Sequence, residues 1–167
     1  MRGPLSEAPA ARSWHVGEWS GLAWLETTLK VAGIAVGIAA LMTALDHPAD
    51  RASGVRLAGT IILAILSLGL VAAIADRVAD REVVGVVFIL GMNVGHWAMT
   101  VALARDPDIG GLLLAFAGLM LAGDLVKLAF LATSDFTVRA VPPAVVYGLT
   151  SVYAVGYVVL IVIAAAI

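Results

Sequence analysis

The feature that most limits how this chain can fold is a succession of five long apolar runs that take up most of its length. An α-helix needs about 20 apolar residues to cross a hydrocarbon core about 30 Å thick, and it satisfies its own backbone hydrogen bonds there. We therefore predict an all-α integral membrane protein, a five-transmembrane-helix bundle formed by residues 21–167. The predicted spans are residues 21–45, 57–75, 83–104, 110–132 and 144–167.

Composition supports a membrane protein and excludes several kinds of chemistry. Hydrophobic residues make up 62% of the 167 residues and charged residues 13%, against about 25% charged in soluble domains. The net charge is −2 and the arginines lie between the apolar runs, so we expect a lipid bilayer and not nucleic acid as a partner. The lack of cysteine excludes disulfides, thiolate nucleophiles and cysteine-ligated metals. The sequence also contains no catalytic motif of soluble enzymes.

The segments outside the apolar runs predict how the spans connect and how the chain is oriented. Short connectors rich in Asp, Arg, Pro and Gly predict that consecutive spans pack as antiparallel neighbours. Residues 1–20 are predicted to be a tail or a short interfacial segment, since tryptophans favour the membrane surface. Five arginines on the N-terminal side against three opposite favour a cytoplasmic N-terminus in the cell membrane. The five are Arg2, Arg12, Arg77, Arg81 and Arg139, and the three are Arg51, Arg56 and Arg105.

Four charged side chains lie inside the predicted spans, where an uncompensated charge costs about 3 kcal/mol near the bilayer centre. They are Glu26 and Lys30 in the first span and Asp124 and Lys127 in the fourth. At about 1.5 Å of rise per residue, Glu26 and Lys127 lie about 8 and 9 Å from the N-terminal side of the membrane. Lys30 and Asp124 both lie at about 14 Å. Complementary charges therefore occur at matching depths on two antiparallel helices.

The matching depths predict a double ion pair between these spans, Asp124 with Lys30 and Lys127 with Glu26. The spacing within each helix, i,i+4 and i,i+3, allows intrahelical pairs as an alternative. On the first span, the charged face continues into Gly33 and a second glycine four residues later, which lets another backbone approach closely.

Two further polar faces reach the same depth. Asn93 and His96 recur at helical spacing in the third span, and Tyr153 and Tyr157 share a face of the fifth. Tyr153 lies near the depth of Asp124, and Tyr157 near that of His96. Only the second span lacks such a face, because the hydroxyls of Thr60 and Ser67 can bond to their own backbone carbonyls. We expect it to be the most peripheral span.

Each of these groups has a structural and a functional interpretation. The four charges are either a clasp that fixes helix packing or a hydrated site for protons or a substrate. His96 is expected to be a neutral imidazole bonded to a carbonyl or to Asn93, with proton transfer as an alternative. Haem ligation by His96 needs a ligand from elsewhere, since His15 and His47 lie outside the spans. We predict no metal site and no other cofactor, and Tyr153 and Tyr157 are more simply packing residues.

Three classes of function fit this pattern. The first is a non-catalytic subunit that packs on other membrane chains or on itself through close-packing steps such as Gly33/Gly37 and Gly91/Gly95. The second is a proton-coupled carrier of a small solute, in which Asp124, Lys30 and His96 bind and release protons or solute. The third is a membrane enzyme or redox protein that acts on a lipid-soluble substrate such as a quinone.

Overall fold

The computed structural model describes residues 19–79, 83–133 and 143–167, and within these residues it contains five α-helices and no strand. All five are long and apolar enough to cross a membrane, which confirms the predicted number and type of elements. The second helix begins three residues before the predicted span and extends beyond its end. The expected interfacial segment falls outside the described residues, apart from Trp19 and Ser20. The helices are α1 (Gly21–Leu45), α2 (Gly54–Ala79), α3 (Val83–Arg105), α4 (Gly110–Thr133) and α5 (Pro143–Ala164).

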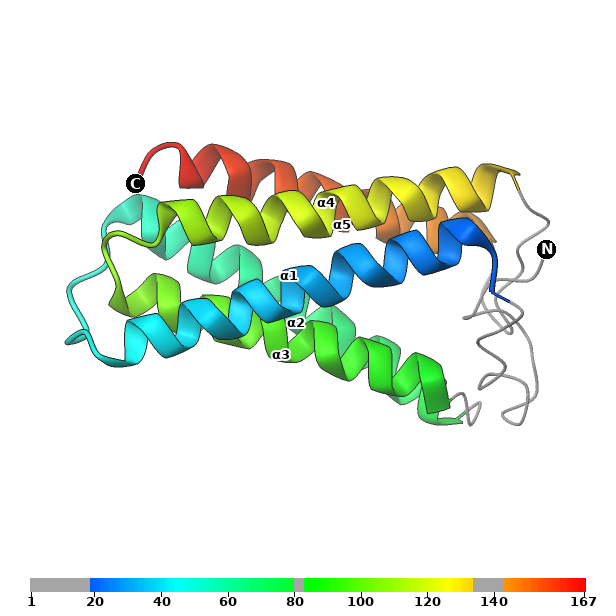
Figure 1. Ribbon diagram of the computed structural model, residues 1–167, viewed down its shortest axis with the longest axis horizontal. Helices are drawn as coiled ribbons and strands as arrows, with labels where there is room; N and C mark the ends of the chain where they lie inside the picture. Colours follow the sequence, from blue (N-terminus) through cyan, green and yellow to red (C-terminus); the bar gives the residue numbers. More distant parts are fainter. Residues whose placement is uncertain (1–18, 80–82, 134–142) are drawn as a thin grey trace.

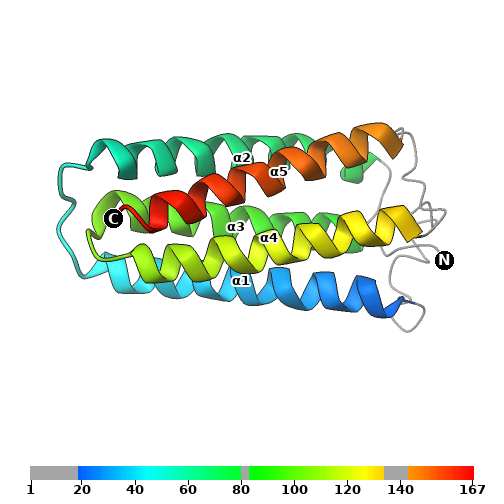
Figure 2. The same cartoon turned by 90° about the horizontal axis from the view of Figure 1, so that it is seen from above.

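The helices form a ring in the order α1, α3, α2, α5, α4 and back to α1 (Figures 1 and 2). The expectation that consecutive helices are neighbours holds for α2 with α3 and for α4 with α5. It is wrong for α3 with α4, and for α1 with α2, which lie on opposite sides of the bundle in Figure 2. The connector of residues 46–53 is long enough to carry the chain past α3. The small residues on the inner face of α1 then pack against α3 and α4 instead.

The inner face of α1 shows why it packs so closely. Its buried residues follow one another at intervals of three or four, and most are glycine or alanine. A side-chain carbon added at Gly37 would come within 2.9 Å of the Gly95 carbonyl oxygen of α3, and one at Gly33 within 2.9 Å of the Met120 sulfur of α4. The two glycines therefore let α1 lie against both neighbours.

The end of the bundle at which α1 and α3 finish is closed. The Arg105 guanidinium donates hydrogen bonds to the backbone oxygens of Ala44 and His47, at 3.2 and 2.8 Å, and so caps the last turn of α1. The interior on this side is filled with fully buried apolar side chains. Among them are Leu63, Leu103, Leu113 and Leu160.

At the opposite end of the bundle, helices α1 and α3 lie farther apart than at the closed end (Figure 1). Figure 1 shows that α1 and α3 diverge toward the end at which both of them begin. The buried charged residues Glu26, Lys30 and Asp124 all lie in the half of their helices nearer this end. The charge cluster of Glu26, Lys30 and Asp124 therefore lies away from the closed end of the bundle. Large apolar side chains such as Val31, Leu68 and Val155 cover the outside.

Candidate functional site

Lys30 lies at the centre of a buried charge cluster. Its ammonium nitrogen Nζ is 2.9 Å from Glu26 Oε1, one turn earlier on α1, and 2.8 Å from Asp124 Oδ1 on α4. The cross-helix contact predicted for Lys30 is thus present, and so is the intrahelical alternative. The predicted Glu26–Lys127 pair stays a prediction. Lys30 is 2% exposed and Asp124 3%, so this cluster is enclosed by the chain itself.

Gly123 makes the contact between Lys30 and Asp124 possible. A side-chain carbon at Gly123 would lie 2.8 Å from Lys30 Cγ and 3.1 Å from Lys30 Cε. The aliphatic part of Lys30 therefore passes directly over the backbone of α4 to reach the neighbouring Asp124. On the α3 side, the ammonium lies 5.9 Å from the centre of the Phe88 ring, within the range of a cation–π contact.

The second oxygen of Asp124 is the least satisfied atom of the cluster. Oδ1 accepts from Lys30, whereas Oδ2 is buried and has no hydrogen-bond partner among the described residues. A buried acceptor left without a donor costs about 1–3 kcal/mol, and more when it is charged. Such an oxygen is a natural binding point for a proton or for a ligand that brings N–H or O–H groups.

His96 and Tyr157 form a second buried pair, between α3 and α5. His96 Nδ1 is 2.7 Å from the Met92 carbonyl oxygen, which can only accept, so Nδ1 carries a proton. Nε2 of a neutral ring then accepts from the Tyr157 hydroxyl at 2.6 Å. This is the carbonyl-bonded imidazole that the sequence led us to expect. Ligation of haem by His96 would have to break the bond to one of these partners.

Helix α2 contributes more to the interior than expected. Ser67 is fully buried and donates a hydrogen bond to the side-chain oxygen of Asn93 on α3, so the expectation that it bonds to its own helix is wrong. The Tyr153 hydroxyl donates to the Leu66 carbonyl oxygen at 2.7 Å. It fits because residue 69 is glycine, where a side-chain carbon would lie 2.6 Å from that hydroxyl. In the sequence, only the small residues Ser67 and Gly69 indicate that α2 contributes polar contacts to the interior.

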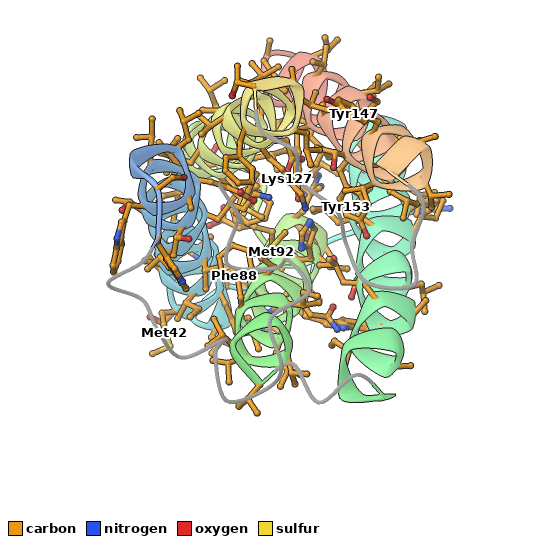
Figure 3. The ribbon with its side chains drawn as sticks, turned by 90° about the vertical axis from the view of Figure 1, so that its right-hand side faces the viewer. Met42, Phe88, Met92, Lys127, Tyr147 and Tyr153 are labelled. Carbon is orange, nitrogen blue, oxygen red and sulfur yellow. The ribbon has the colours of Figure 1, made fainter. Side chains whose placement is uncertain are left out.

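The charge cluster and the histidine pair belong to one interior region. The rings of Tyr153 and Tyr157 are 6.4 Å apart, and each lies within about the same distance of His96. Figure 3, which looks along the bundle, shows Tyr153 and Lys127 on the inner side of the ring of helices and Met42 on the outer side.

This arrangement can bind and move protons, but the described residues offer little to a metal ion. They contain no group of three or more carboxylate or imidazole side chains placed to hold one. No protein-family model, curated protein or solved structure matches the chain. The case for a function therefore depends on the geometry of the buried polar groups.

Proposed function

We propose that the protein is a small multi-pass carrier of the cell membrane, which couples the movement of a small solute to protons bound at Asp124. The observation that carries this proposal is the unpartnered Oδ2 of Asp124, buried beside an ion pair. Buried ionisable groups inside membrane helices are expensive and commonly mark proton or substrate pathways.

Protonation of Asp124 provides a way to couple chemistry to helix packing. Ionised Asp124 attracts Lys30 and so links α4 to α1. Neutral Asp124 loses the charge that attracts Lys30, and the ammonium keeps its partner Glu26 on its own helix. One proton thus shifts Lys30 from a shared contact to an intrahelical contact and weakens the link between α1 and α4. A carrier needs such a bistable contact to change access from one side to the other.

The packing of the glycines favours the carrier over the subunit interpretation. That interpretation depends on the glycine steps of α1 and α3 being available to other chains. Gly33, Gly37 and Gly95 instead contact side chains or backbone of the same bundle. The charged groups likewise face the interior of the chain and not its outer surface. The predicted association with other chains, or with itself, would have to use other residues.

The redox enzyme interpretation has less support from the contacts. A quinone bound by His96 or Tyr157 would need a polar atom of these side chains to face it. The two side chains hydrogen bond to each other, and the other imidazole nitrogen is bonded to Met92. Among the described residues, the buried acceptor without a hydrogen-bond partner lies on Asp124 instead.

Proton coupling can be tested in liposomes that contain the purified protein and an internal pH-sensitive dye. Gradients of methylammonium, sodium, an amino acid and a carboxylate are imposed one at a time. We expect at least one gradient to change the internal pH faster than in protein-free liposomes. Asp124→Asn, which keeps an oxygen for Lys30 but cannot ionise, should abolish that change.

Asp108→Asn is the matched control, because Asp108 is exposed in the connector between α3 and α4. It should transport as the wild type does. Proton movement of equal rate in the Asp124→Asn protein, or no proton movement with any of the gradients, would contradict the proposal.

A further inference from the structure

We infer that the solute is a small organic cation of the ammonium type, which competes with Lys30 for the Asp124 carboxylate. This inference rests on the proposed function and specifies its substrate class. A second ammonium group would bind at Asp124 Oδ2 and draw Asp124 away from Lys30.

The Lys30 ammonium shows what the charge cluster recognises. It has two carboxylate partners at 2.8 and 2.9 Å and the face of the Phe88 ring at 5.9 Å. Carboxylate oxygens accept charge-assisted hydrogen bonds from N–H groups, and aromatic faces attract organic cations. An alkylammonium solute has both features, as the Lys30 side chain does. Asp124 Oδ2 is an acceptor still open to such a donor.

Other ligand classes fit these surroundings less well. An anion needs hydrogen-bond donors, whereas the unpartnered atom here, Asp124 Oδ2, is an acceptor. Hard metal cations take six or more oxygen ligands in well-defined shells, and the described residues provide no cluster of three carboxylate or imidazole groups. A primary ammonium needs only a few acceptors in the directions of its N–H groups. A single unpartnered carboxylate oxygen can therefore contribute to its recognition.

Binding at Oδ2 makes the solute and the proton exclude each other. When the alkylammonium binds, the O–H bond of protonated Asp124 breaks and the proton leaves to solvent. The ionised carboxylate then accepts an N–H hydrogen bond from the ammonium, so one positive charge replaces another. Mutually exclusive binding of this kind predicts exchange, with the solute and the proton moving in opposite directions.

Titration calorimetry of the full-length protein in detergent tests this inference, with methylammonium chloride as the probe. We expect saturable binding. In the pH range where Asp124 is protonated, the heat should depend on the ionisation enthalpy of the buffer, because a proton is released. The apparent affinity should fall about tenfold per pH unit where Asp124 is protonated, by mass action. Tetramethylammonium, which has no N–H group, should bind at least tenfold more weakly. Asp124→Asn should not bind methylammonium.

The variant Lys30→Met provides an independent readout, since it removes the resident ammonium. Methylammonium should raise its melting temperature more than that of the wild type, because the probe restores a partner to the two carboxylates. If Lys30→Met does not fold, the comparison of methylammonium binding to the wild type and to Asp124→Asn tests the inference by itself. Lack of binding to the wild type, or equal binding to Asp124→Asn, would overturn the inference.

The two proposals can fail separately. Binding of methylammonium without proton movement in liposomes contradicts the proposed function and supports the inferred site. Proton movement driven by another solute, without methylammonium binding, supports the carrier and contradicts the inferred substrate class.

Discussion

At the scale of single residues, Lys30 depends on partners from its own helix and from α4, and its removal would leave two buried carboxylates unbalanced. Breaking a buried ion pair by removing one partner costs about 3–5 kcal/mol. We therefore expect Lys30→Met to lower the free energy of unfolding by about that amount. Thermal or denaturant unfolding in detergent measures it. A loss below about 1 kcal/mol, the range of exposed pairs, would mean that the cluster is hydrated.

Gly123 carries no charge, but its lack of a side chain lets Lys30 reach Asp124. Substituting Gly123 therefore tests the position of Lys30. A methyl group at Gly123 would collide with the Lys30 side chain, so Gly123→Ala should destabilise the protein by about 1–3 kcal/mol. Gly118, on the same helix, is the matched control, since open space surrounds the position of an added carbon. Gly118→Ala should be neutral or stabilise by up to about 1 kcal/mol. Equal unfolding free energies of the two variants would refute the proposed position of Lys30.

Tyr157 tests the second buried pair. Tyr157→Phe removes the hydroxyl that donates to His96 Nε2 and leaves a buried acceptor unpaired, which should cost about 1–3 kcal/mol. Tyr147→Phe is the control, because no hydrogen bond of the Tyr147 hydroxyl occurs within the described part of the chain. Its effect on the melting temperature should be small. If both variants melt at the wild-type temperature, His96 does not depend on Tyr157.

At the scale of helices, the close approach of α1 and α3 depends on Gly37. An added carbon there would meet the backbone of Gly95, which cannot move aside as a flexible side chain can. We expect Gly37→Ala to cost more than Gly123→Ala, above about 3 kcal/mol or enough to prevent folding. Gly148→Ala on α5, where an added carbon meets nothing, should unfold as the wild type does. A stable Gly37→Ala protein would contradict the packing of α1 on α3.

The sequence predicted the helices well because hydropathy and length determine them almost alone. It also placed Lys30 beside Asp124, since a constant rise per residue makes depth along antiparallel helices predictable. It failed at Ser67, whose hydroxyl can bond equally well to its own helix or to Asn93, and the spacing of residues does not decide between them. The order of the helices in the ring was not predictable either, because connector length limits but does not fix which helices become neighbours.

At the scale of the whole molecule, the charge cluster can affect stability and function separately. The double variant Lys30→Met with Asp124→Leu leaves one buried carboxylate, Glu26, without its ammonium partner, whereas Lys30→Met alone leaves two. The double variant should therefore cost less stability than Lys30→Met alone. The same variant should lose all proton movement in liposomes, since no group at position 124 can ionise. If the folded double variant still moved protons, the charge cluster would contribute to helix packing and not to proton transport.

Proton binding and release by Asp124 inside the bundle is the step on which the proposed carrier depends. It is tested most directly by labelling with a membrane-permeant carbodiimide, which reacts with protonated carboxyl groups, followed by peptide mass spectrometry. Labelling of Asp124 should increase as the pH falls over a range in which the protein stays folded, and methylammonium should reduce it. Exposed Asp108 in the same sample reports the reactivity of a solvated carboxyl group. If Asp108 is labelled and Asp124 stays unmodified at every pH, Asp124 is a fixed charge and the proposed mechanism is wrong.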